Sequence, residues 1–230
     1  MVGKRIRFKF SKIGVFRYLS HLDIINIIAR AIRRAKIKLE YSKGFNPKPK
    51  IIFGPPIPLG INSFAEYADV NVSDDIDTKK FQFWLNNQLE GRITISNAIE
   101  IPDGMKNLMS QVDIVEYLIE IEGYTCREDS IKELIQQAVK GIDTEKSIYD
   151  IKLLKRECEY SNILLLKVYG YTKTLRGRAN RVFKLKDFLE SLKNILTTKN
   201  MVIKSVLKNE LYILKEGKKL TPFEVLQSFV

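Results

Sequence analysis

With 230 residues, 45% of them apolar, the chain is long enough to bury one large or two small cores, which excludes extended disorder. No run of about 18 apolar residues occurs, and basic residues interrupt the N-terminus from Lys4 onward, so we expect a cytoplasmic protein that does not enter a membrane. Two cysteines and one histidine are too few for a zinc or iron–sulfur site, and we expect no metal and no cofactor.

The positive charge is concentrated at the start of the chain. Residues 1–50 hold 14 Lys and Arg against two acids, Asp23 and Glu40, which accounts for the whole net charge of +12. Clustered like charges repel one another, whereas a polyanionic partner turns the same charges into affinity through counterion release. The charge distribution therefore predicts RNA binding by the first fifth of the chain.

Apolar and basic residues alternate along the first predicted strand, residues 4–10. The inward set is Ile6, Phe8 and Phe10, and the outward set is Arg5, Arg7 and Lys9. A helix over 20–36 follows, with Ser20 as its N-cap and Asp23 in its first turn. Its predicted buried stripe is Leu22, Ile25, Ala29 and Ile32, and its opposite side carries Asn26, Arg30, Arg33 and Arg34.

Five of the seven prolines lie between Tyr41 and Gly60, which predicts stiff loops around a short strand over 50–53. The next strand, 64–72, is expected to point Ala68, Val70 and Val72 inward and Tyr67, Asp69 and Asn71 outward.

A helix over 77–89 and a strand over 93–101 complete the first half. After a linker over 102–110, the same order recurs: a strand over 113–122, a helix over 130–141, strands over 148–157 and 163–170, a helix over 186–197, and strands over 201–207 and 211–215. A short helix is expected to begin at Thr221-Pro222.

This repeated order predicts an α+β fold of two tandem ferredoxin-like (βαββαβ) domains, residues 1–102 and 111–230. In that topology the first strand is central and the helices cover one face of the sheet. Arg5, Arg7 and Lys9 are therefore expected on the open face, where two sheets in tandem would leave a cleft for a nucleic-acid strand.

The nucleic-acid-binding candidates are basic residues of the first 50 positions, together with the aromatic and loop residues among them. They are Arg5, Arg7, Lys9, Arg17, Tyr18, Arg30, Arg33, Arg34, Tyr41, Lys43, Gly44, Phe45, Asn46, Lys48 and Lys50. Arginine forms bidentate contacts with phosphate, and aromatic rings stack on unpaired bases. A second basic run contains Arg176, Arg178 and Arg181, and is either a second RNA contact or a solvated turn. The alternative to RNA binding for both sets is that they are ordinary surface charges in contact with water.

His21 is the one candidate for catalysis. A neutral imidazole at this helix start is a possible general base for a ribose 2′-hydroxyl, but a single histidine in this position more often only packs or bonds a carboxylate such as Asp23. Ser20 is more simply a helix cap than a nucleophile.

Four motifs resemble the family of radical SAM-linked proteins, which are encoded beside or fused to cobalamin-binding radical SAM enzymes. They are Arg17-Tyr18-Leu19-Ser20-His21-Leu22-Asp23, Arg33-Arg34-Ala35, Tyr41 to Lys50, and Pro58-Leu59-Gly60. Lys48 stands where that family usually has histidine, which weakens any mechanism with two histidines. The chain lacks the three-cysteine motif of a radical SAM enzyme, so the resemblance implies a partner that presents substrate to one.

The expected topology is also similar to that of the CRISPR repeat-processing endoribonucleases of the RAMP superfamily. We therefore expect an RNA-binding accessory protein, not itself the catalyst, that presents tRNA or rRNA to a radical SAM modifying enzyme. Two alternatives stay open: a metal-independent endoribonuclease that uses His21, and a protein-interaction module that docks on the radical SAM enzyme.

Overall fold

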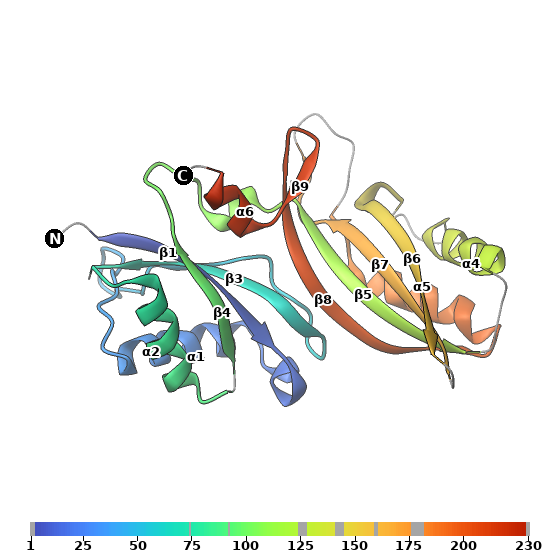
Figure 1. Cartoon of the computed structure of the whole chain (residues 1–230), viewed down its shortest axis with the longest axis horizontal. Helices are drawn as coiled ribbons and strands as arrows, with labels where there is room; N and C mark the ends of the chain where they lie inside the picture. The colour runs from blue at the N-terminus through green and yellow to red at the C-terminus, as the bar shows by residue number, and fades with distance from the viewer. Residues whose placement is uncertain are drawn as a thin grey trace. The chain divides into compact units, whose positions relative to one another are not determined.

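The computed structural model describes residues 3–73, 75–91, 93–123, 128–140, 145–158, 161–175 and 182–228. The chain forms two compact units (Figure 1). Unit 1 contains residues 1–112 together with 213–230, and unit 2 contains residues 113–212. The C-terminal segment thus groups with the N-terminal unit, whereas the sequence places it in a domain over 111–230. No helix within the described ranges is both long and apolar enough to cross a membrane.

Unit 1 begins with a βαββαβ order. Its elements are β1 (Lys4–Lys12), a 3-10 helix η1 (Gly14–Tyr18), α1 (His21–Arg34), β2 (Ile51–Phe53), β3 (Asn62–Val72), α2 (Thr78–Leu89) and β4 (Thr94–Glu100). β1 pairs with β4 on one side and with β3 on the other, and β2 pairs with the far edge of β3, all antiparallel. This is the strand order of a ferredoxin-like sheet, with β1 central as predicted.

The core of unit 1 lies between the sheet and its two helices. Ile6, Phe8 and Phe10 of β1 are buried as predicted, and they belong to one apolar cluster with residues of α1 and α2 such as Ile28 and Phe81. The second face of the sheet is also covered, because the ring of Phe223 lies 5.3 Å from that of Tyr67 on β3. The covering elements are α3 (Leu108–Gln111) and α6 (Pro222–Gln227), and the short strand β9 (Lys218–Leu220), which pairs with the end of β8, precedes α6.

α1 starts where the sequence predicts, because Ser20 and Asp23 form a reciprocal capping box. The Asp23 amide donates to Ser20 Oγ at 3.1 Å, and the Ser20 amide donates to Asp23 Oδ2 at 3.0 Å. The predicted buried stripe is only half right. Ala29 and Ile32 are buried, but Leu22 is 69% exposed, since the side that meets the sheet is formed by Ile24, Ile28, Ala31 and Ile32.

Unit 2 repeats the same order. Its elements are β5 (Ile114–Gly123), α4 (Glu128–Lys140), η2 (Glu145–Ser147), β6 (Ile148–Cys158), β7 (Ser161–Tyr171), α5 (Leu185–Thr197) and β8 (Met201–Lys215). β5 pairs antiparallel with β7 and β8, and β7 pairs with β6, so β5 is again central. Ser191 Oγ donates to the Ala138 carbonyl at 2.9 Å and ties α5 to α4.

The predicted α+β fold with two ferredoxin-like units is therefore confirmed. One detail differs: the strands expected over 201–207 and 211–215 form one strand, β8, whose residues after Tyr212 belong to unit 1 and pair there with β9.

Candidate nucleic-acid interface

The central strand of unit 1 carries a buried ion pair. Arg7 of β1 stands directly opposite Asp69 of β3 in the antiparallel register. The Arg7 Nε donates to Asp69 Oδ1 at 2.7 Å, and its Nη2 donates to Asp69 Oδ2 at 3.0 Å. The two side chains are 0% and 1% exposed. A bidentate arginine–carboxylate pair is the geometry that best compensates two charges removed from water.

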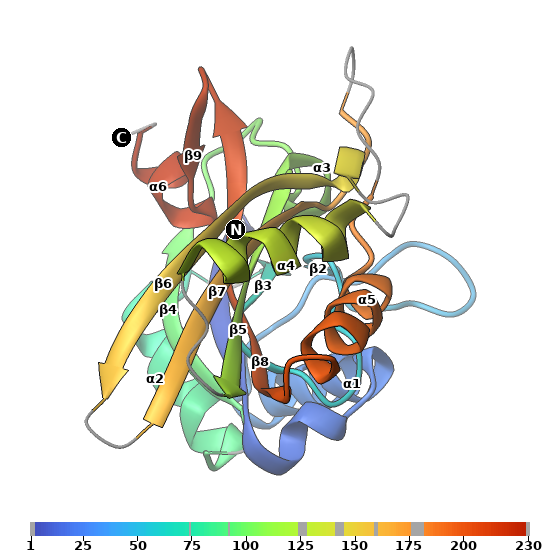
Figure 2. The same cartoon turned by 90° about the vertical axis from the view of Figure 1, so that its right-hand side faces the viewer.

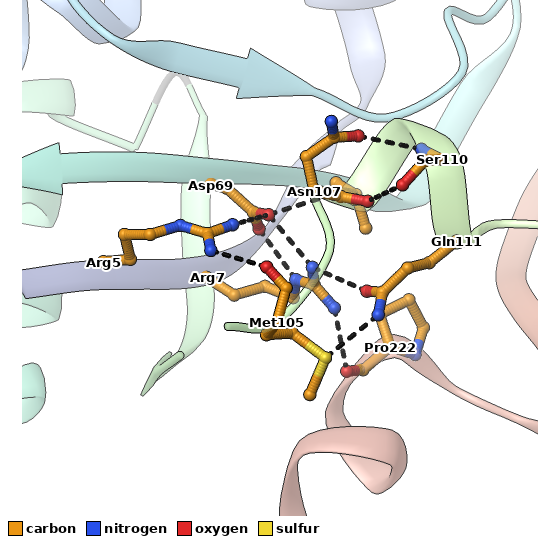
Figure 3. A network of polar contacts seen from close by, with 9 residues as sticks. Arg5, Arg7, Asp69, Met105, Asn107, Ser110, Gln111 and Pro222 are labelled. Carbon is orange, nitrogen blue, oxygen red and sulfur yellow. Dashed lines mark hydrogen bonds and ion pairs between the residues drawn. The ribbon is translucent and has the colours of Figure 1, made fainter. Parts of the chain in front are cut away.

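The remaining donors and acceptors of this pair bind the segments that cover the second face of the sheet (Figure 3). Arg7 donates to the Gln111 Oε1 at 3.1 Å and to the Pro222 carbonyl at 3.3 Å. Asp69 Oδ2 accepts the Leu108 amide at 3.1 Å. The pair therefore connects β1 and β3 with both ends of α3 and with the start of α6, which come from distant parts of the chain.

The expectation that Arg5, Arg7 and Lys9 form an open cationic face is wrong for Arg7, which is fully buried. Arg5 is 25% exposed, donates to the Met105 carbonyl at 2.7 Å and lies 3.7 Å from Asp69. Lys9 is half-buried, with its Nζ 5.4 Å from the centre of the Tyr67 ring. The physical reason is that an acid and a covering segment from later in the chain reach this face. We leave these three residues out of the interface.

Three candidate residues lie around the start of α1. Arg17 and Tyr18 are the last residues of η1, and His21 is the first residue of α1. The Arg17 guanidinium lies 4.8 Å from the centre of the Tyr18 ring and donates to its hydroxyl at 2.8 Å, while Tyr18 is 62% exposed. Arg17 Nε is buried and makes no hydrogen bond with the part of the chain that the structure describes. The His21 ring packs edge-on against Phe53 at 5.6 Å.

Two polar residues beside His21 in the sequence, Ser20 and Asp23, serve the helix. Hydrogen bonds from the Ser20 hydroxyl and amide lower the pKa of Asp23, since they favour its charged form. Both groups are thereby committed to the cap of α1. The small cavity beside His21 is lined by the buried residues Lys12 and Glu66, which the sequence analysis did not single out.

The exposed side of α1 presents the arginines that the sequence predicts there. Arg30, Arg33 and Arg34 are all exposed. Arg34 donates to the Gln88 carbonyl at 2.8 Å. The side chains of Arg30 and Arg33 have no hydrogen-bond or ion-pair partner among the described residues. Lys36, just beyond the helix, is likewise exposed and was missed, although it continues the basic run Arg33-Arg34.

The loop from Tyr41 to Lys50 is closed at its base. Tyr41 forms a β-bridge with Pro49, the Ser42 amide donates to the Lys48 carbonyl at 2.8 Å, and the Lys48 amide donates to Ser42 Oγ at 3.0 Å. Lys50 pairs with Glu40 at 3.0 Å and lowers the pKa of that carboxyl. Figure 2 shows this light-blue loop standing out from the rest of unit 1.

The residues of the loop tip all point into solvent. Lys43, Gly44, Phe45, Asn46 and Lys48 are exposed, and Tyr41 is 40% exposed. Gly44 has φ of 129°, a backbone conformation that favours glycine. We define the α1–loop surface by its exposed residues, which are Arg30, Arg33, Arg34, Lys36, Tyr41, Lys43, Gly44, Phe45, Asn46, Lys48 and Lys50. The remaining candidates, Arg176, Arg178 and Arg181, lie outside the described residues.

The two units define a tandem ferredoxin-like protein. The chain belongs to the family described as an uncharacterized protein conserved in bacteria (DUF2344), which matches residues 5–211. None of the curated proteins matches the sequence.

Three solved structures illustrate how distant the structural similarities are. A Nop10-Cbf5 complex of an archaeal box H/ACA sRNP is 10% identical over 88% of this chain and 46% of that chain, with a TM-score of 0.41. A Cbf5-Nop10-Gar1 complex is 9% identical over 97% and 54%, with a TM-score of 0.45. An unknown protein from Galdieria sulphuraria is 13% identical over 93% and 100%, with a TM-score of 0.28. This chain spans about half the length of the first two. Similarities this low do not indicate what the chain binds.

Replacing Asp69 with Asn should destabilise the protein by about 3–5 kcal/mol, because it leaves the Arg7 charge buried without a counter-charge. Urea unfolding measures the loss. The matched control is Asp75→Asn, which breaks the ion pair of Lys4 with an aspartate that is 86% exposed and should cost far less, because exposed ion pairs add little to stability. Equal losses for the two variants would contradict the role given to the Arg7–Asp69 pair.

Proposed function

We propose that the protein binds RNA through the α1–loop surface and presents it to a radical SAM modifying enzyme. The observation that supports this most directly is the excess of positive charge over residues 21–50, whose two acids are already bonded within the described part of the chain. Residues 21–50 contain eight Lys and Arg and two acids, and those acids are occupied, Asp23 by the cap of α1 and Glu40 by Lys50.

Apart from Lys50, which pairs with Glu40, the cations of this surface have no acid paired with them among the described residues. Arg30, Arg33, Lys43 and Lys48 are exposed and have no hydrogen-bond or ion-pair partner for their side chains in the described part of the chain. Such a set of like charges is unfavourable in the isolated protein, and a phosphate backbone relieves it by replacing condensed counterions. Arginine adds bidentate contacts with phosphate oxygens, which lysine does not make.

RNA fits this surface better than an acidic protein does, because aromatic rings accompany the charges. Tyr41 and Phe45 are exposed beside Lys43 and Lys48. Proteins that recognise RNA in single-stranded regions combine basic residues with rings on which bases stack. Carboxylates of an acidic protein would pair with the arginines and lysines, but they offer the two rings nothing to stack on.

Reversing the charge of Arg30 and Arg33 together should weaken RNA binding more than tenfold. The slope of log affinity against log salt should fall in magnitude by about 1.4, since each lost contact with single-stranded phosphate removes about 0.7. Binding of a labelled tRNA to the full chain, measured by fluorescence anisotropy over a salt series, tests this.

The matched control reverses Lys79 and Lys80, two exposed residues of α2 outside the α1–loop surface. This variant has the same net charge as the Arg30/Arg33 variant and should bind nearly as well as the wild type. Equal weakening by both variants would show general attraction to a basic protein and would overturn the proposed surface.

RNA recovered from these reactions should be intact, because the proposal gives His21 no role as a base, and Ser20 and Asp23, which flank it in the sequence, form the helix cap. Cleavage of RNA by a His21 base would leave 2′,3′-cyclic phosphate ends. Such ends, produced by the wild type and lost in His21→Ala, would favour the endoribonuclease alternative.

The partner enzyme is proposed from the motifs that resemble radical SAM-linked proteins, of which the Tyr41 to Lys50 segment forms the projecting loop. Purification of the full chain from its native host should recover RNA together with a radical SAM enzyme. Recovery of the enzyme without RNA, after nuclease inhibitors are included, would favour the protein-interaction alternative.

A further inference from the structure

Phe45 is the most exposed large apolar side chain in the described part of the chain, at 112% of the reference value. Other phenylalanines of unit 1, such as Phe8 and Phe81, are completely buried. A phenyl ring fully in water gives up the favourable burial that makes aromatic residues valuable in cores and interfaces. The exposure of Phe45 therefore indicates that its ring contacts a ligand when the protein binds one.

The ring is presented by a braced loop. The two hydrogen bonds between Ser42 and Lys48 close the loop three residues from Phe45, and the Tyr41–Pro49 bridge closes it four residues from Phe45. Pro47 fixes its own φ and restricts Asn46, the residue before it. A loop shaped before binding loses less conformational entropy when a ligand arrives.

The residues beside the Phe45 ring indicate which class of ligand the loop binds. Lys43 and Lys48 flank the tip with exposed ammonium groups, and the segment from Tyr41 to Lys50 contains no acid. Asn46, next to Phe45, offers both a donor and an acceptor. An anionic ligand with a flat ring and polar edges meets all of these groups, and a nucleotide has this composition.

We propose that the 41–50 loop binds a single unpaired nucleotide of the RNA, with its base stacked on Phe45 and the adjoining phosphates contacted by Lys43 and Lys48. This deepens the proposed function and rests on it. Bases within a duplex expose only their edges, and the major groove of A-form RNA is too narrow for side chains to read. The substrate class is therefore RNA with a bulged, looped or extruded base, which is also the form in which enzymes modify bases.

Three synthetic RNA hairpins test the proposal with the full chain: one fully paired, one with a single bulged adenosine, and one with an abasic bulge that has the same number of phosphates. The wild type should bind the adenosine bulge most tightly. Phe45→Ala should weaken binding to that hairpin by roughly 5- to 100-fold and leave the other two unchanged. Phe45→Trp should retain the preference, because a larger ring still stacks.

The salt dependence separates stacking from charge. Phe45→Ala removes no charge, so the salt slope should not change, whereas Lys43→Gln with Lys48→Gln should lower it for all three hairpins. Equal binding of the three RNAs by both wild type and Phe45→Ala would overturn base stacking and leave RNA binding through the α1–loop surface in place. Failure of the wild type to bind any of the three would overturn both proposals, and binding of an acidic peptide instead would identify a protein as the partner of this loop.

Discussion

The buried pair of Arg7 and Asp69 determines which side of unit 1 is available to a partner. Taking both charges out of water costs several kcal/mol per ion unless each is fully hydrogen-bonded. The structure meets this condition by bringing the Leu108 amide, the Gln111 side chain and the Pro222 carbonyl to the pair. The hydrogen bonds of the Arg7–Asp69 pair therefore form only when segments 105–111 and 222–227 lie over the sheet.

This constraint divides the positive charge of the N-terminal region into two parts with different roles. The part on β1 stabilises the fold, through Arg7 with Asp69 and through Lys4 with Glu100 at 3.2 Å. The part on α1 and the following loop has few acids near it and is exposed together with Phe45. On the covered face Arg7 is withdrawn from solvent, whereas the α1–loop surface keeps its cations exposed, and the proposed binding site is therefore built there.

Local patterns predicted the elements well, because their signals lie within a few residues of one another. The alternation in β1, the Ser20–Asp23 cap and the proline at the start of α6 all appear where expected. The partners of Arg7 were not predictable in this way, since Asp69 lies 62 residues away and Pro222 lies 215 residues away. Alternation along β3 shows only that Asp69 points away from α1 and α2, and it does not reveal a second layer over that face. The phase of α1 was misjudged because Leu22, in its first turn, is apolar yet lies outside the buried side.

Hydrogen–deuterium exchange of the full chain, with and without saturating RNA, tests most directly which side of unit 1 binds. We expect slower exchange of backbone amides over residues 30–50 and no change over 105–111 and 222–227, because those two segments are already fastened to the Arg7–Asp69 pair. Protection of 105–111 and 222–227 with residues 30–50 unchanged would place the RNA on the covered face and contradict the account.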